Sequence, residues 1–514
     1  MTPVAEAGEV PRPGRGRSLL WPAAVAVVSA VVWLGVRGSL IDDSYITLGY
    51  ARNLAEHFHW GLVGAETANS ATSPLNVILL ALGGTLTRVA GGQVHPVAGT
   101  GIVFVAAMTA VGWAWARIAR ALRLPFGTAV AGTAAVLLNP FVLSATGLEV
   151  QLISAALLLL TAYALEGRAV GFGVVAGLAV LVRLDLVIFV VLLALGVGAL
   201  RRRLLPLVAI ALAVCLPWFV FSWFALGSAI PDTFLIKTTQ GAFGEYNYGN
   251  GPVYYLDPKR RTATLVSFAP AVAGLLVLLA WLGRLGVRRR GAERSEAGRF
   301  GPVGVLGLGG LAYYAAYSQL GVPPYQWYYV APIVALTTVF VVGAGYLATL
   351  ARGRAGLRGV AVTVAGLAAA VAVLPAGYLD VQRGVPWTTP PIFGNWSTSA
   401  DYARVGRAVG ALVGDATVAA PPEIGTLAYF CECTMVDTFA DQGRVVPLVD
   451  ARIAESGTVG GFLLRLNYHW LDRAQRPRPV DYRLQWSWTP ISGPDTWHLY
   501  SPATGDGWAR LVRA

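Results

Sequence analysis

The sequence is poor in charged residues. Asp, Glu, Lys and Arg make up 13% of its 514 positions, whereas soluble globular proteins carry roughly 25%. Hydrophobic residues make up 55%, and the mean hydropathy is +0.59. These values argue against a soluble globular protein and favour a polytopic membrane protein. The net charge of +12 would suggest nucleic-acid binding in a soluble chain, but here the positions of the basic residues are more informative than their sum.

Lysine and cysteine are also scarce. The only lysines are Lys237 and Lys259, so a lysine in an outer polar loop is a candidate for a specific role. The three cysteines are too few for a disulfide framework. Cys431 and Cys433 are separated by one residue, and a bridge across so short a loop is strained. We therefore expect two free thiols there rather than a disulfide.

Long apolar runs fill most of the chain. A helix that crosses a bilayer needs about 20 apolar residues. Such runs predict about eleven spans, at residues 19–37, 96–116, 126–145, 148–165, 169–183, 186–200, 204–224, 262–283, 302–320, 328–350 and 357–376. The stretch "PLNVILLALGGTL" (74–86) is shorter and is followed by Arg88. We expect it to form an interfacial or re-entrant helix that does not cross.

The distribution of arginine orients these spans. Cytoplasmic loops of membrane proteins are enriched in Lys and Arg. With residues 1–18 as a cytoplasmic tail, the arginine-rich loops at 117–123, 201–203, 284–299 and 352–358 all fall on the cytoplasmic side. No small-residue cleavage site ends the first apolar run, so we expect that run to be retained as a span. We interpret the basic runs as topology signals rather than binding sites.

This orientation leaves three long segments on the outer side: residues 38–95, residues 225–261 and everything from residue 377. In the last segment, "DYARVGRAVGALV" has the period of an amphipathic helix, and "YRLQWSWTP" and "TWHLYSPA" alternate like strands. The predicted fold class is mainly α. It comprises a polytopic helical membrane domain over 19–376 and a small extracytoplasmic α/β domain over 377–514.

Two adjacent carboxylates, Asp42 and Asp43, stand where the first span ends. They open "DDSYITLGYARNLAEHF", which has the pattern of an amphipathic helix lying on the membrane. One acid could cap this helix, but a charged pair is costly at a membrane boundary. Two neighbouring carboxylates raise the pKa of one of them, which suits a general base. From the spacing alone, capping and catalysis are both open.

Further polar and aromatic residues are predicted on the same side. Glu149 and Lys237 lie at the outer ends of spans, where a charge needs a partner or a function. Arg183 lies at another outer turn and could simply pair with Asp185. Three more candidates for substrate contacts are His59, Tyr325 and Trp327. Aromatic residues there could equally form an interfacial belt, but acids, cations and aromatics on one face suit an enzyme that binds a lipid phosphate.

The order of these motifs resembles the GT-C superfamily of integral-membrane glycosyltransferases, which use polyprenyl-phosphate-linked sugars on the outer side of the membrane. The stretches that carry the resemblance are "DDSYITLGYARNLAEHFHWGLVGAETANSATSPLNVILLAL", "TGLE", "LVRLD", "GSAIPDTFLIK", "YQWYY" and "APPEIGTLAYF". They look like the group related to the terminal arabinofuranosyltransferase of the actinobacterial cell wall. The match spans nearly the whole chain.

The resemblance implies roles for individual residues. Asp42 and Asp43 are the candidates for the catalytic base and its partner, and Lys237 for a contact to the donor phosphate. Glu149 is implied as a second acid that lines the cavity. Weaker candidates for the pocket are Arg183, Tyr325, Trp327 and His59.

The sequence therefore predicts a multi-pass cell-membrane glycosyltransferase. It would move a sugar, with arabinofuranose suggested by the resemblance, from a polyprenyl-phosphate donor to an extracytoplasmic cell-envelope glycan or lipid, with inversion. The phosphate is already a good leaving group, so no cofactor is required, although the chemistry leaves room for a divalent metal. Membrane lipids are expected partners and nucleic acid is not. The alternatives are a flippase of lipid-linked sugar, which would need paired broken helices, and a non-enzymatic envelope protein with an outer binding domain.

Overall fold

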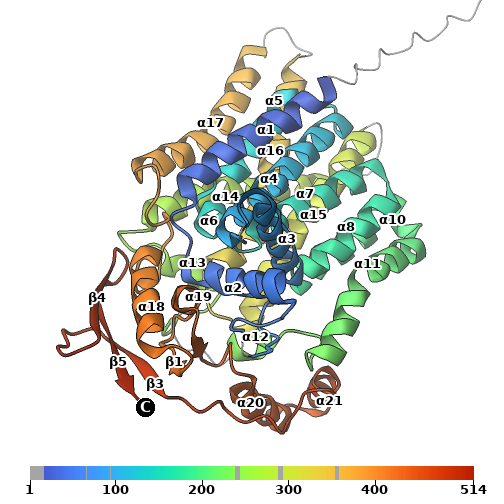
Figure 1. The fold of residues 1–514 in the computed structure, drawn as a ribbon. Coiled ribbons are helices and arrows are strands. Elements are labelled where there is room, and N and C mark those ends of the chain that lie inside the picture. The colour runs from blue at the N-terminus through green and yellow to red at the C-terminus, as the bar shows by residue number, and fades with distance from the viewer. Residues whose placement is uncertain (1–16, 65, 93, 238–242, 288–292, 353–357) are drawn as a thin grey trace, which may run out of the picture.

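The computed structural model describes residues 17–64, 66–92, 94–237, 243–287, 293–352 and 358–514. The expected cytoplasmic tail, residues 1–18, lies almost entirely outside these ranges. Figure 1 shows long helices packed side by side, with the C-terminal helices and strands gathered at one end of them. The prediction of a mainly helical fold with a small C-terminal sheet is confirmed.

The membrane part consists of helices that follow the predicted apolar runs. They are α1 (Arg17–Val36), α3 (Pro74–Gly91), α4 (Pro96–Ala121), α5 (Phe126–Leu137), α7 (Val150–Glu166), α8 (Ala169–Val182), α9 (Val187–Gly196), α11 (Leu204–Ala225), α14 (Arg261–Val287), α15 (Glu293–Leu320), α16 (Val330–Arg352) and α17 (Arg358–Gln382). Among the described residues, five helices are long and apolar enough to cross a membrane, namely α1, α4, α11, α14 and α16. The total of about eleven spans stays a prediction.

Short helices lie between these long ones. They are α2 (Asp42–His57), α6 (Pro140–Ser144), η1 (Leu184–Leu186), α10 (Gly198–Arg201), α12 (Thr233–Ile236), α13 (Gly251–Tyr254) and η3 (Gln326–Tyr329). Helix α2 confirms the amphipathic helix predicted after the first span. The apolar stretch expected over 74–86 forms α3, which continues to Gly91 and packs against α2 and α4.

Two of the predicted spans are not continuous helices. In the run 126–145, α5 ends at Leu137 and α6 begins at Pro140. Proline has no N–H group and its ring clashes with the preceding turn, so it starts a helix more readily than it continues one. The side chain of Asn139 accepts a hydrogen bond from the amide of Phe141 at 3.0 Å and caps the new helix. The run 186–200 is likewise divided between α9 and α10.

The C-terminal part contains helices and a five-stranded sheet. Its elements are α18 (Ser399–Val413), β1 (Thr417–Ala419), α19 (Gly425–Cys431), β2 (Thr434–Val436), α20 (Gln442–Glu455), α21 (Thr458–Asn467), β3 (Tyr482–Ser487), β4 (Thr496–Ser501) and β5 (Gly505–Arg513). The strand order is β2-β1-β3-β5-β4, with β1 parallel to β2 and β3 and the other pairs antiparallel. The helix and the two strands predicted from "DYARVGRAVGALV", "YRLQWSWTP" and "TWHLYSPA" are therefore confirmed.

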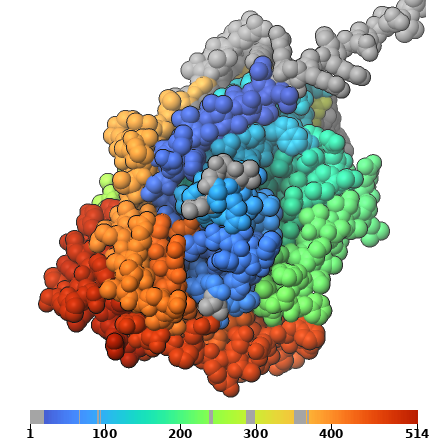
Figure 2. Space-filling model, in the orientation of Figure 1, coloured from blue at the N-terminus to red at the C-terminus, as the bar shows by residue number. Residues whose placement is uncertain are grey.

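The C-terminal part shares a hydrophobic core with the segment that follows α1. Tyr50 of α2 and Trp60 after it belong to the same buried cluster as Val405 of α18, Val418 of β1 and Leu427 of α19. Figure 2 shows the C-terminal residues, coloured orange to red, lying directly against the blue N-terminal part of the chain. Because these apolar faces bury one another, the core fixes the C-terminal elements against one end of the membrane helices.

The expectation of free thiols in "CEC" is wrong. Cys431 and Cys433 form a disulfide whose Cα atoms are 5.0 Å apart, a separation that lies within the ordinary range for such bonds. Glu432 between them adopts the left-handed conformation, with φ of 55°. This turn at the end of α19 brings the two side chains together. Among the described residues, Cys215 is a free cysteine, and it is buried in α11.

Glycine allows α14 and α16 to approach each other closely. A Cβ atom added at Gly274 would lie 1.8 Å from the carbonyl oxygen of Leu336 in α16. Small residues at helix contacts are the usual means by which membrane helices pack. Gly283, on the same helix α14, has open space where its Cβ would be.

We therefore expect Gly274→Ala to lower the free energy of unfolding by about 1–3 kcal/mol, because the added methyl group must displace the backbone of α16. Gly283→Ala is the matched control and should leave stability unchanged or slightly higher, since alanine favours helix. Thermal unfolding of both full-length variants in detergent measures the difference. Equal melting temperatures for the two variants would contradict this account of the helix contact.

Candidate active site

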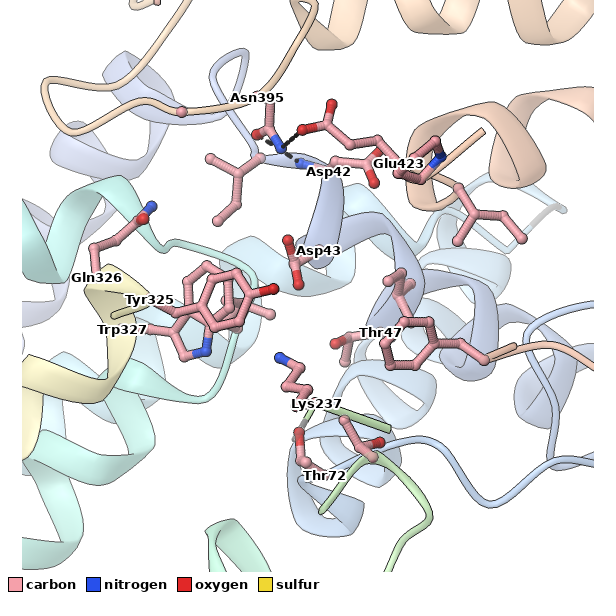
Figure 3. Close-up of a pocket in the computed structure, with 18 of the residues that line it drawn as sticks. Asp42, Asp43, Thr47, Thr72, Lys237, Tyr325, Gln326, Trp327, Asn395 and Glu423 are labelled. Atoms are coloured by element: carbon pink, nitrogen blue, oxygen red, sulfur yellow. Dashed lines mark hydrogen bonds between the residues drawn. The ribbon is translucent and has the colours of Figure 1, made fainter. Parts of the chain in front are cut away.

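A cavity of about 520 Å³ lies where the membrane helices meet the C-terminal part. Its wall includes the start of α2, the turn before α7, the residue after α12, η3 and the segment that leads into α19. The lining residues that carry chemistry are Asp42, Asp43, Glu149, Lys237, Arg260, Tyr325, Trp327, Asn395 and Glu423. Six of the eight residues singled out in the sequence thus line one cavity, and Figure 3 shows most of them.

Asp42 is the first residue of α2, and its buried carboxylate binds the start of α19. Its Oδ2 accepts a hydrogen bond from the amide of Gly425 at 2.9 Å, and its Oδ1 accepts one from the amide of Thr426 at 2.7 Å. The N-cap of α2 itself is Ile41, which makes no side-chain cap. Asp42 therefore does cap a helix, but the helix belongs to the C-terminal part of the chain.

Asp43 faces the interior of the cavity. Its carboxylate points toward the ammonium group of Lys237 (Figure 3), and the charge of that group acts on it. Among the described residues, no residue other than Asp43 itself donates a hydrogen bond to this carboxylate. The two adjacent aspartates therefore differ in their surroundings. Both oxygens of Asp42 accept hydrogen bonds from α19, whereas the carboxylate of Asp43 faces the cavity without such bonds.

Lys237 directly follows α12 and lies within a cage of aromatic rings. Its Nζ is 4.5 Å from the ring centroid of Tyr325, 5.1 Å from that of Trp327 and 5.6 Å from that of Tyr328. The rings of Tyr325 and Trp327 are stacked, with centroids 4.6 Å apart. Cation–π contacts of this kind stabilise an ammonium group that is partly removed from water. The cage positions the cation while leaving it able to bind an anion in the cavity.

The two acids have raised pKa values for partly different reasons. Burial raises the pKa of Asp42 to about 6, the amides of Thr426 and Gly425 act against this increase, and the charge of Asp43 adds to it. Burial also raises the pKa of Asp43, the charge of Lys237 lowers it, and the charge of Glu149 raises it. Neighbouring carboxyl groups in unlike surroundings commonly take different roles in catalysis.

Arg183 lies outside the cavity and acts on it through Glu149. Its guanidinium donates to Oε1 of Glu149 at 2.7 Å and pairs with Asp185 at 2.6 Å. It also stacks on the ring of Tyr328 at 4.8 Å. The pairing with Asp185 that the sequence left open is present, and the expectation of a pocket contact by Arg183 is not met. Glu149 does line the cavity, held in place by this ion pair.

Glu423 is a cavity residue that sequence reasoning missed. Its carboxyl group accepts hydrogen bonds from the side chain of Asn395 at 3.0 Å, the amide of Trp396 at 3.0 Å and the hydroxyl of Tyr402 at 2.7 Å. Burial and then the charge of Asp42 raise the pKa of Glu423 to about 8. The stretch "PPEIG" could have indicated it, because a single acid among apolar residues and glycine suggests a specific partner or function.

Arg260 is a second cation on the cavity wall. It pairs with Asp257 and lies over the ring of Tyr254 at 4.5 Å. In the sequence it stands in the run "DPKRR", where nothing distinguished it from Arg261. Neighbouring Lys259 has a different role, since its ammonium group donates to the carbonyl oxygens of the β4–β5 turn at 2.8 and 2.9 Å.

His59 is not brought to the cavity. Its Nε2 lies 2.8 Å from the carbonyl oxygen of Glu66, within the loop that follows α2. The ring therefore stabilises the fold of that loop, because it links its two sides. The expectation that His59 contacts substrate has no support in this position.

The cavity combines acids, two cations and aromatic rings. Cations of this kind hold phosphate oxygens through charge-assisted hydrogen bonds, and a carboxylate can take a proton from a hydroxyl group. Within the described residues, no group of three or more His, Cys, Asp or Glu side chains is arranged to hold a metal ion. The residue set suits displacement of an anionic leaving group by a hydroxyl group.

Two comparisons with known sequences found no relative. No protein-family model matches the sequence, and no curated protein matches it. Similarity to known proteins is therefore found in the fold.

Solved structures match the fold over almost the whole chain. ArnT from Cupriavidus metallidurans, in a structure bound to undecaprenyl phosphate, is 15% identical with a TM-score of 0.52, and the match covers 96% of this chain and 98% of ArnT. The oligosaccharyltransferase AglB from Archaeoglobus fulgidus, in complex with an inhibitory peptide and a dolichol-phosphate, is 12% identical with a TM-score of 0.53. That match covers 91% of this chain and 69% of AglB. The resemblance predicted from the motifs is confirmed at the level of the fold: over almost its whole length the chain has the architecture of ArnT and AglB.

Proposed function

We propose that the protein is a membrane glycosyltransferase that moves a sugar from a polyprenyl-phosphate donor to a hydroxyl group on an extracytoplasmic glycan or lipid. The observation that carries this proposal is that Asp43 and Lys237, which are 194 positions apart in the chain, face each other in one cavity. The proposal is further supported by the two solved structures with this fold, which contain undecaprenyl phosphate and dolichol-phosphate.

The geometry favours Asp43 over Asp42 as the general base. Both oxygens of Asp42 accept backbone hydrogen bonds, so using one for proton transfer would break the contact to α19. The carboxylate of Asp43 faces the cavity and is not held in this way. Its raised pKa brings its basicity closer to that needed to accept a proton from a hydroxyl group near neutral pH.

In the proposed reaction, the acceptor oxygen attacks the anomeric carbon as Asp43 takes its proton. The bond between that carbon and the phosphate oxygen breaks, and the phosphate leaves with the electron pair. Lys237 and Arg260 neutralise the negative charge that gathers on the phosphate. A single displacement of this kind inverts the configuration at the anomeric carbon. Arabinofuranose is the first donor sugar to test because the sequence motifs suggest it.

The direct test uses the full-length protein in lipid nanodiscs with a radiolabelled polyprenyl-phosphate sugar and an envelope extract as acceptor. We expect label to enter the acceptor and free polyprenyl phosphate to appear in equal amount. Comparing the envelope glycans and lipid-linked sugars of a deletion strain with those of its parent identifies the sugar and the acceptor together. Movement of the intact lipid-linked sugar across the membrane, with no release of polyprenyl phosphate, would instead favour a flippase.

Substitution of the two acids should have different effects. We expect Asp43→Asn to lower kcat by about 100-fold or more, the lower end of what a general base contributes, with an unchanged melting temperature. Asp42→Asn should destabilise the protein by about 1–3 kcal/mol, because the amide NH₂ group cannot accept one of the two backbone hydrogen bonds. Initial rates and thermal unfolding of both variants separate the two effects.

Asp506→Asn is the matched control for these substitutions. Asp506 lies on the β4–β5 hairpin and pairs with His498 at an exposed position, so the same chemical change there should affect neither measurement. Full activity of Asp43→Asn would end the assignment of Asp43 as the base.

The pH dependence of transfer should respond to the two charges that act on Asp43. The rate falls as the pH drops through the pKa of the base, because only the ionised form accepts a proton. Glu149→Gln removes a negative charge that raises this pKa, so the acid limb of kcat/KM should move to lower pH. Lys237→Met removes a positive charge that lowers it, so the residual activity should show an acid limb at higher pH. Shifts in the same direction for both variants would show that Asp43 does not set this limb.

A further inference from the structure

Helix α21 carries an apolar stripe on its outer surface. Val459, Phe462, Leu463 and Leu466 recur at the spacing that places residues on one side of a helix. Their exposed fractions range from 49% to 73%. A stripe of this kind is unusual on a surface that faces water, and it requires an explanation.

The opposite side of α21 is already occupied. Leu464 packs against a buried cluster that includes Val449 of α20, Tyr468 and Leu471. The outward stripe is therefore not needed for the internal packing of the C-terminal part. The helix has one apolar side for the protein and another that, among the described residues, no part of the chain covers.

The stripe lies next to the C-terminal end of α11. The indole Nε1 of Trp223 donates a hydrogen bond to the carbonyl oxygen of Leu466 at 2.8 Å. The ring of Trp470, which follows α21, contacts that of Phe224 with centroids 5.3 Å apart. Figure 1 shows α21 beside this end of α11. Only 11% of the apolar span of α11 is buried by the rest of the protein, so its sides are available to lipid.

We propose that α21 lies at the interface between membrane and water on the extracytoplasmic side, with its apolar stripe among the acyl chains just below the lipid headgroups. Continuity with the exposed side of α11 argues for lipid rather than a protein partner. Trp223 and Trp470 fit this position, because tryptophan is enriched at the level of the lipid headgroups. Arg465, an exposed residue of α21, would meet the lipid phosphates, as basic residues of interfacial helices do.

An interfacial α21 would also set how deeply Lys237 lies relative to the membrane surface. Leu235 and Ile236, directly before Lys237, belong to the same buried cluster as Val449 and Leu471. A helix anchored in the interface would therefore hold the Lys237 turn close to the level of the lipid phosphates. This consequence rests on the proposed function, whereas the location of α21 does not.

Spin labelling of the full-length protein in nanodiscs tests the location. A nitroxide is attached to Phe462→Cys, and in a second sample to Leu463→Cys, in a Cys215→Ala background. Its collision rates with oxygen and with a water-soluble nickel chelate give its depth. Leu216→Cys, on the exposed side of α11, provides the reference in lipid, and Glu455→Cys, an exposed acid of α20, provides the reference in water.

We expect the labels at positions 462 and 463 to collide with oxygen as the lipid reference does, at a depth of about 5–10 Å below the headgroups. Collision with the nickel chelate at the rate of the water reference would overturn the proposal, because the stripe would then face water. Protection from both reagents would also overturn it, because the stripe would then be covered by protein. The measurement requires no transferase activity, so failure of the proposed function would not affect it.

Discussion

The contact between the Asp42 carboxylate and the first amides of α19 joins segments that are 383 positions apart in the chain. It connects the end of the first span to the C-terminal part, in a place where both partners are buried. A buried carboxylate without such partners would be costly, and the free amides of a helix start need an acceptor. The carboxylate and the amides therefore satisfy each other's hydrogen-bonding capacity. The cavity exists because this contact and the shared core beside it hold its two walls together.

The same contact separates the roles of two identical side chains. Both acids line the cavity, but both oxygens of Asp42 are committed to α19, whereas the carboxylate of Asp43 is not held by that helix. On the other side, the aromatic rings of η3 and the turn after α12 place one ammonium group. The placement of Lys237 depends in turn on α20 and α21, whose packing cluster includes the two residues before it. Elements of the C-terminal part thus shape both the acidic and the basic side of the site.

Much of the helical fold was predictable because burial in a bilayer imposes a simple rule on sequence. Apolar runs of sufficient length become helices, and the predicted runs match α1, α4, α11 and α14 closely. The break within 126–145 was missed because hydropathy alone does not register a helix start at Pro140. The break within 186–200 was missed because hydropathy does not register the extended backbone of Val197. The disulfide of Cys431 was missed because it depends on the left-handed backbone of Glu432, which residue spacing does not reveal.

The sequence by itself determined the helical class of the fold and most of the chemical groups in the cavity. Acids, a rare lysine and aromatic residues at span ends are conspicuous because each is costly near a membrane unless it has a partner. Only the tertiary structure decided which groups meet. It brought Glu423 and Arg260 to the cavity, placed Arg183 behind Glu149 and left His59 in a loop. Such contacts depend on how distant segments pack against one another, and packing is a property of three-dimensional shape that local sequence patterns do not encode.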